Sequence, residues 1–274
     1  MNSNDYSNSV SLLLPTKGRY KALLDSLNSL SETEGAKYLL DVIILADQDE
    51  KSYEIANGFL RDHMFRSYKV VYSAKRLYPV KAFLFLYELC TSRYFCFMND
   101  ENSYKPNWLI NALARFNADF LDKIGLLSLF KKKKAGLCLT SQDFVQYNEG
   151  EIYNPAYTLY YSDDELSMRA ILLGRYSWLE DNGVFHDEEI TKAVSAISWE
   201  EKIALKKVDR GIFYKRSETN FGLPEEKIYP WKGFREVNLP LKGEINGTSR
   251  NSKNLSSLEI KEKFLFTYML EKGK

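Results

Sequence analysis

Short apolar runs alternate with amphipathic stretches through the first half of the chain. Val10 to Leu14 is a continuous apolar run that stops at Pro15, which is typical of a strand covered on both faces. Leucines at helical spacing follow it. The same alternation predicts further strands at 42–46, 68–72 and 94–98, and helices around 55–60, at 80–90 and from Pro106 onward. Strand and helix alternating at this spacing predict βαβ units and a mostly parallel sheet.

The pattern changes after Ile124, where the apolar runs become shorter. We expect strands at 124–130, 136–140 and 144–147, with the Lys131 to Lys134 run as a turn between the first two. A helix is expected at 164–173, because acidic residues before it suit the positive end of a helix dipole. From Ile190 onward charge density rises and Gly and Pro interrupt the pattern, so the last part is expected to be helical and irregular.

Composition narrows the classes of protein. The 274 residues suit one large domain or one domain with an appendage. The 38 basic and 37 acidic residues give a net charge of +1, whereas a protein that holds nucleic acid mainly by its phosphates usually carries a basic excess. Any basic surface must therefore be local. The aromatic content of 14% favours either a thick core or a stacking surface.

The cysteines and the N-terminal sequence indicate in which cellular compartment the protein is expected. The three cysteines form no CxxC pair, and Cys90 and Cys96 lie in apolar context, which indicates free thiols in a reducing compartment. The first ten residues lack the basic start and apolar stretch of a signal peptide. No apolar run approaches the ~20 residues of a membrane span. We expect a cytoplasmic protein with no transmembrane segment.

The sequence lacks the motifs of several common enzyme classes. The chain has no GxxxxGK[ST] phosphate loop, no GxGxxG dinucleotide fingerprint and no GxSxG nucleophile elbow. With only His63 and His186, a multi-histidine zinc site is excluded. What remains is carboxylate chemistry, together with a cation that prefers oxygen ligands.

Charged residues follow the predicted strands, where parallel sheets bind their ligands. Asn99-Asp100-Glu101 ends a very apolar strand, and adjacent acids are costly there unless a cation or hydrogen-bond donors neutralise them. Mg²⁺ or Mn²⁺ suits such a pair, although the tripeptide alone favours a solvated acidic turn before the Pro106 helix. Among the basic residues, Arg19, Arg76 and Lys81 are candidates to meet diphosphate charge, and an exposed loop is an equal alternative for Arg76.

The order of three segments resembles the inverting family-two glycosyltransferases of the GT-A fold, which use nucleotide sugars. These segments are Val10 to Arg19 with its P-T-x-x-R strand end, Val42 to Asp47, and Tyr94 to Glu101. The resemblance implies an α/β, GT-A-like (Rossmann-like) mixed, mostly parallel sheet flanked by helices. It also implies that the nucleotide sugar is bound by Pro15, Thr16, Arg19, Asp47 and Asp100, and that Asp100 and Glu101 hold the metal. Arg76 and Lys81 are expected to join the nucleotide-sugar site because of their charge and their position after the third strand.

A second element of the resemblance lies further along the chain. Ser162 to Ala170 resembles the family's E-D-x-D-L-S-x-R element, which places Asp163 on the aspartate that serves as general base, with Asp164 as the alternative. His186 lies where some members place another metal ligand. Three residues depart from the family pattern: Asn99 replaces the first acid of the usual triplet, Glu101 replaces its last aspartate, and Ser162 replaces a glutamate. The acceptor-site aromatic is expected among Tyr157, Tyr160, Tyr161 and Trp178.

The expected function is metal-dependent, inverting transfer of a sugar from a nucleoside-diphosphate sugar to an acceptor hydroxyl, with Mn²⁺ or Mg²⁺. A UDP-sugar is the expected donor, and a polyanionic polymer or modified DNA are candidate acceptors. The transferase domain is expected to span 1–190, with a nucleotide half at about 9–120 and an acceptor half at about 121–190, followed by an extension over 191–274. Two alternatives stay open: a catalytically degenerate sugar-nucleotide binding module, and a nucleotidyltransferase.

Overall fold

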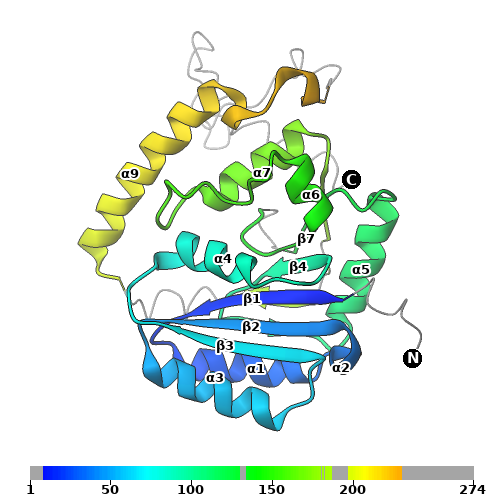
Figure 1. Cartoon of the computed structure of the whole chain (residues 1–274), viewed down its shortest axis with the longest axis vertical. Coiled ribbons are helices and arrows are strands. Elements are labelled where there is room, and N and C mark those ends of the chain that lie inside the picture. Colours follow the sequence, from blue (N-terminus) through cyan, green and yellow to red (C-terminus); the bar gives the residue numbers. More distant parts are fainter. Residues whose placement is uncertain (1–8, 130–133, 180, 182, 187–196, 230–274) are drawn as a thin grey trace, which may run out of the picture.

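A computed structural model of the chain describes residues 9–129, 134–179, 181, 183–186 and 197–229. Its centre is a seven-stranded sheet in the order β3-β2-β1-β4-β7-β6-β8 (Figure 1). β1 (Val10–Thr16), β2 (Leu40–Asp47), β3 (Ser67–Ser73) and β4 (Tyr94–Phe97) pair in parallel. The expected α/β architecture, a mixed and mostly parallel sheet flanked by helices, is therefore confirmed.

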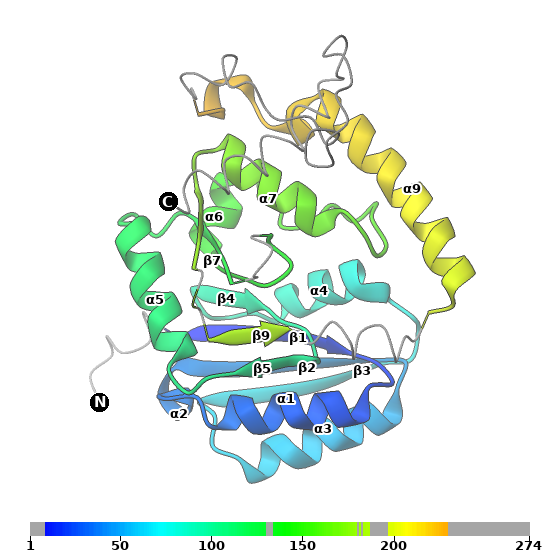
Figure 2. The same ribbon diagram turned by 180° about the vertical axis from the view of Figure 1, so that it is seen from behind.

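Helices connect the parallel strands in the manner of βαβ units. α1 (Tyr20–Ser31) and the short α2 (Ala36–Leu39) join β1 to β2, α3 (Glu50–Asp62) joins β2 to β3, and α4 (Tyr78–Glu88) joins β3 to β4. Figure 2 shows α1 and α3 side by side on one side of the sheet and α4 on the other.

The second half of the chain completes the sheet and adds a small one. β6 (Leu126–Ser128), β7 (Cys138–Ser141) and β8 (Tyr176–Trp178) extend it, and β7 is antiparallel to both of its neighbours. β5 (Asn102–Tyr104) and β9 (Val184–His186) form a separate antiparallel pair. The helices that the structure describes in this half are α5 (Trp108–Asp119), α6 (Gln142–Tyr147), α7 (Ser162–Leu172) and α9 (Trp199–Glu218), and 3₁₀ turns follow at Asn220–Gly222 and Glu225–Lys227.

Two apolar cores lie on opposite faces of the sheet, because successive side chains of a strand point to opposite faces. Leu13 of β1 packs into the core beneath α4, α6 and α7, whereas Leu12 and Leu14 pack into the core shared with α1, α3 and α5. All three leucines are fully buried. The uninterrupted apolar run of β1 therefore reflects burial on both faces, as expected.

One predicted strand is wrong. Residues 144–147, expected to be extended, belong to the helix α6. The physical reason lies just upstream, where the Ser141 hydroxyl accepts the backbone N–H of Phe144 and caps the helix. A run of four apolar-leaning residues does not by itself distinguish a strand from a single buried helical turn. The Lys131–Lys133 part of the basic run lies outside the described residues.

The three cysteines are free, as expected. Cys96 and Cys138 are buried and Cys90 is half-buried, and burial raises the pKa of all three thiols. In the part of the chain that the structure describes, no helix combines the length and the apolar character that a membrane span needs.

Candidate functional site

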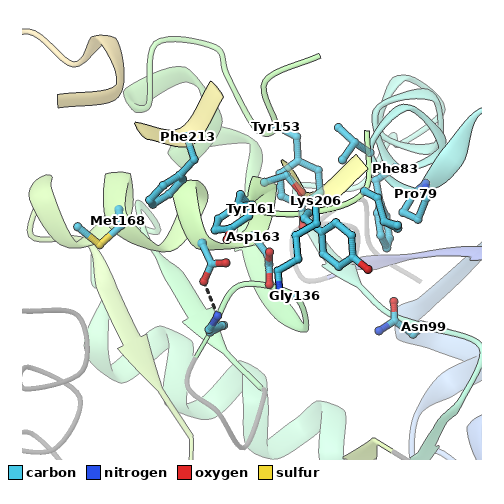
Figure 3. Close-up of a pocket in the computed structure, with 16 residues that line it drawn as sticks. Pro79, Phe83, Asn99, Gly136, Tyr153, Tyr161, Asp163, Met168, Lys206 and Phe213 are labelled. Atoms are coloured by element: carbon cyan, nitrogen blue, oxygen red, sulfur yellow. Dashed lines mark ion pairs between the residues drawn. The ribbon is translucent and has the colours of Figure 1, made fainter. Parts of the chain in front are cut away.

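Two adjoining cavities open at the carboxyl ends of the parallel strands. The smaller one, of about 260 Å³, lies at the ends of β1 and β2. The larger one, of about 630 Å³, lies between α4, the start of α7 and α9 (Figure 3). The residues that line both cavities are Pro79, Phe83, Asn99, Leu159 and Tyr160. Because the two cavities share these residues, two ligands bound in them would lie next to each other.

The smaller cavity gathers most of the residues that were expected to bind the nucleotide. Its lining includes Pro15, Thr16, Arg19, Asp47 and Arg76. Lys81, by contrast, is exposed on α4 and lines neither cavity. Lys17 and Lys202 also line the smaller cavity, so its charged lining is mostly basic, which suits a diphosphate.

Asp47 lines the smaller cavity and also accepts hydrogen bonds from the backbone. Its two carboxylate oxygens accept the N–H groups of Leu77 at 2.8 Å and Tyr78 at 3.2 Å, and the Arg76 Nε lies 3.4 Å away. These bonds tie the end of β2 to the start of α4. Tyr78 itself holds a left-handed backbone with φ 61°, which costs energy for a non-glycine residue.

The acidic pair lies directly behind Arg19. The Thr16 hydroxyl donates to Asp100 at 2.7 Å, and the Arg19 guanidinium forms ion pairs with both Asp100 and Glu101. The antiparallel pairing of β5 with β9 places His186 opposite Asn102, and its Nε2 lies 3.1 Å from a Glu101 oxygen. The structure therefore places His186 against Glu101, the sequence neighbour of Asp100, and none of these three expected metal ligands lines either cavity.

The two acids of this pair titrate in opposite directions. Burial and the adjacent Glu101 raise the pKa of Asp100 well above its ordinary value. Burial also acts to raise the pKa of Glu101, but hydrogen bonds from His186 and Asp100, with the charge of Arg19, lower it to about 2. The low pKa of Glu101 therefore keeps its carboxylate ionised, and this carboxylate contacts the side chains of Arg19 and His186.

The donor set of this cluster fits a divalent cation by residue type. Asp100 and Glu101 offer buried carboxylate oxygens and His186 offers an imidazole nitrogen, a combination that Mn²⁺ accepts. Among the described residues, however, no three His, Cys, Asp or Glu side chains already converge as a ligand set. Arg19 engages both carboxylates instead, so a metal ion would have to take its place beside at least one of them.

The larger cavity contains the two aspartates that were expected to act as base. Asp163 and Asp164 come from the first turn of α7, and Lys134 forms an ion pair with Asp164 at 2.5 Å (Figure 3). Burial raises the pKa of Asp163 to about 6, helped by the neighbouring Asp164 and opposed by Lys134. A carboxyl group that titrates near neutrality is suited to accept a proton.

A glycine makes room for this carboxyl group. A Cβ at Gly136 would lie 3.2 Å from an Asp163 carboxylate oxygen, which is a tight contact. Gly136 therefore lets the backbone before β7 approach Asp163 closely.

Aromatic rings cover much of the remaining wall. Tyr160 and Tyr161 line the larger cavity, whereas Tyr157 and Trp178 do not. Tyr157 is fully buried and donates its hydroxyl to Glu165 at 2.6 Å. Sequence reasoning missed Tyr153, Phe213 and Lys206, which also line this cavity. The helical spacing of Lys202, Lys206, Asp209 and Phe213 marks one face of a helix, but the sequence alone does not indicate what that face covers.

Comparisons with known proteins agree with this fold. The family model "Glycosyl transferase family 2" matches residues 11–150, about half of the chain. No protein with a curated description matches the chain significantly. The fold resembles the crystal structure of S. aureus TarS 1-349, with TM-score 0.54 and 14% identity over 80% of this chain and 76% of that one.

A second solved structure also has a similar fold. The mannosyltransferase PcManGT from Pyrobaculum calidifontis, in complex with GDP-Man and Mn²⁺, has TM-score 0.60 and 12% identity over 81% of this chain and 67% of that one. TarS 1-349 is also known in complex with UDP-GlcNAc, where TM-score is 0.54 and identity 13% over 86% and 77% of the two chains.

Proposed function

Because the chain belongs to glycosyl transferase family 2, we propose that it transfers a sugar from a nucleoside-diphosphate sugar to an acceptor hydroxyl with inversion at the sugar. The observation that carries this proposal is the position of Asp163, whose carboxyl group has a pKa of about 6 and faces a cavity that adjoins the smaller, mostly basic one. An inverting transfer needs these two places side by side, one for the proton acceptor and one for the departing diphosphate.

The smaller cavity is proposed as the donor site. Arg19, Arg76 and Lys202 supply positive charge for the diphosphate, and Thr16 and Asp47 at the strand ends contact the nucleoside. A UDP-sugar is the proposed donor. Structural neighbours bind UDP-GlcNAc in one case and GDP-Man in another, so both nucleotides belong in the test.

Metal dependence is part of the proposal. Asp100, Glu101 and His186 would hold Mn²⁺ or Mg²⁺ once Arg19 releases the carboxylates. A bound divalent ion would supply Lewis-acid stabilisation of the leaving diphosphate. Arg19, released from the acids, would then be free to donate to phosphate oxygens at the cavity it already lines.

Asp163 is proposed as the general base. Its neighbour Asp164 is engaged by Lys134, whereas Asp163 has a carboxyl group in the cavity wall that accepts a proton near neutral pH. The acceptor hydroxyl would lie in the larger cavity, where Tyr153, Tyr160 and Phe213 offer faces for a sugar ring. Lys206 on the same wall suits an acceptor with negative charge.

Release of nucleoside diphosphate from a panel of sugar nucleotides, measured with Mn²⁺ and with a chelator, tests this function. We expect release from one sugar nucleotide, faster with metal than with chelator, and faster still with a suitable acceptor. Binding of a sugar nucleotide without release of nucleoside diphosphate would indicate a catalytically degenerate binding module, an alternative suggested by Asn99 in place of an acid in the triplet. Formation of pyrophosphate from a nucleoside triphosphate and a sugar phosphate would indicate a nucleotidyltransferase.

A further inference from the structure

The helix α9 forms part of the wall of both cavities, although it lies outside the region that the family model matches. Lys202 lines the smaller cavity, and Lys206 and Phe213 line the larger one. Figure 1 shows α9 as a long helix that runs from the level of α7 to the level of α4. One face of this helix is therefore turned toward both cavities.

Asp209 lies on that face, where it is fully buried. Its carboxylate accepts three consecutive backbone N–H groups, those of Thr158 at 3.0 Å and of Leu159 and Tyr160 at 2.8 Å each. A buried carboxylate is costly unless such donors satisfy it, and bonds from backbone N–H to a charged acceptor are stronger than neutral ones. The contact therefore places the segment 158–160 firmly against α9.

The segment that Asp209 holds is the wall between the two cavities. Leu159 and Tyr160 line both of them. On its other side the segment contacts α4, where the Thr158 carbonyl accepts the Val80 N–H at 3.4 Å. Immediately after it, Tyr161 adopts a left-handed backbone with φ 67° and leads into α7. A shift of the segment would therefore change both cavities and the approach to Asp163.

We propose that Asp209 is a positioning residue, which holds Leu159 and Tyr160 in place as the common wall for donor and acceptor. This inference rests on the proposed function, because it assigns the two cavities to the two substrates. Asp209 itself lines neither cavity, so it acts through the backbone of the segment rather than by touching a substrate.

Asp209→Asn tests the proposal, because the side chain keeps its size but its amide group cannot accept a hydrogen bond at the nitrogen. We expect amide hydrogen exchange in residues 158–160 to accelerate at least tenfold, with little change elsewhere. We expect the Kd for UDP or GDP, measured by calorimetry, to rise about fivefold or more. Glu218→Gln removes a charge from an exposed position of the same helix and should change neither.

A double-mutant cycle distinguishes positioning from a purely structural role. Tyr160→Ala removes the wall side chain and leaves the Asp209 carboxylate with its backbone donors. If Asp209 acts through this wall, Asp209→Asn should add little to the Kd in the Tyr160→Ala background. Should Asp209→Asn not fold, Asp209→Ser, whose hydroxyl can accept one N–H group, replaces it in the same cycle.

Two results would overturn the inference. One is an unchanged nucleotide Kd with faster exchange along the whole chain, which would mean that Asp209 contributes stability alone. The other is full additivity of Asp209→Asn both with Tyr160→Ala and, in the same kind of cycle, with Leu159→Ala, which would mean that Asp209 acts through neither wall residue. Failure of the proposed function is distinguishable from both results, because the unsubstituted protein would then bind neither UDP nor GDP in the calorimetric titration. In that case the inference would also be overturned.

Discussion

At the scale of single residues, the carboxyl group of Asp163 is the most informative feature of the molecule. Its pKa of about 6 contrasts with the behaviour of Glu101, whose pKa of about 2 keeps it ionised at any physiological pH. Burial acts on both groups, but Glu101 gains hydrogen bonds from His186 and the charge of Arg19, whereas Asp163 has the like charge of Asp164 beside it. One environment favours permanent charge, and the other favours proton transfer.

The first prediction concerns the base. Asp163→Asn keeps the size of the side chain but cannot accept the acceptor's proton, so kcat should fall about 10²-fold or more with nearly unchanged donor affinity. In the unsubstituted enzyme, kcat should rise with pH through about 6 and then level off, because the base acts in its deprotonated form. Steady-state kinetics between pH 5 and 8 measure both effects.

Asp164→Asn is the matched comparison for this prediction. If Asp164→Asn abolishes activity and Asp163→Asn has a mild effect, Asp164 is the base. Thermal unfolding supplies a second control. A raised pKa means that the folded state disfavours the ionised form, so this cost grows as pH rises from about 4 to 6 and persists above. Asp163→Asn should therefore be more stable than the unsubstituted protein at pH 8, by about 1–3 kcal/mol, and by much less at pH 4.

The second prediction concerns the metal. Titration of UDP and GDP should show binding at least tenfold tighter with Mn²⁺ than with chelator for the nucleotide that the enzyme uses. Glu101→Ala should remove this difference, and His186→Ala should weaken binding and reduce the preference for Mn²⁺ over Mg²⁺, since imidazole suits Mn²⁺ better. Glu88→Ala, at an exposed position at the end of α4, serves as the control.

The outcome that would contradict the metal site is equal nucleotide affinity with and without metal in the unsubstituted protein. Asp100 and Glu101 would then be acids whose permanent counter-ion is Arg19. Arg19 already forms ion pairs with both acids, so they can be neutralised without a metal ion. The titration therefore distinguishes a site that binds metal from one in which Arg19 is the counter-ion.

At the scale of helices and strands, hydrophobic patterning predicts the parallel half of the sheet well. The runs at 10–14, 42–46 and 68–72 become β1, β2 and β3 with small extensions at their ends. The runs of β1 and β2 are strong signals because both faces of these strands are buried and must be apolar, whereas β3 is an edge strand whose residues are exposed or half-buried. The run at 144–147 failed because it is short, and the hydroxyl of Ser141 decides its conformation through a local cap.

The contribution of α9 could not be predicted in the same way. Its Arg216 donates to Glu165 of α7 at 2.7 Å and to Glu151 at 2.9 Å. Contacts between residues far apart in the sequence produce no periodic pattern of hydrophobic residues. The sequence therefore predicts a helical extension but not which part of the domain this extension contacts.

The third prediction belongs to this contact between helices. Arg216→Met keeps much of the apolar length but removes the cationic partner of the buried Glu165, so the free energy of unfolding should fall by about 2–4 kcal/mol. Lys215→Met, at the exposed neighbouring position, should change it by less than about 0.5 kcal/mol. Urea unfolding measures both. An equal loss in the two variants would show that the ion pairs of Arg216 do not hold α9 in place.

At the scale of the whole molecule, the site combines segments that are widely separated along the chain. Strand ends supply Thr16 and Asp47, the start of α7 supplies Asp163, and α9 supplies Lys202. The first three follow from the resemblance to family-two enzymes because their motifs are local. The partners of Arg19 and the donors to Asp209 do not follow from it, because they depend on how distant segments pack.

The position of β1 in the sheet also has a consequence for synthesis. β1 needs β4 on one side, and Thr16 meets its partner Asp100 across 84 residues of chain. At ordinary ribosomal speeds of about 5–20 residues per second, β4 follows β1 after an interval on the order of ten seconds. Throughout that interval the apolar run of β1 has an unpaired edge, which is the kind of segment that aggregates or recruits chaperones. The strand whose end lines the smaller cavity is therefore also one that the nascent chain must protect for a long interval.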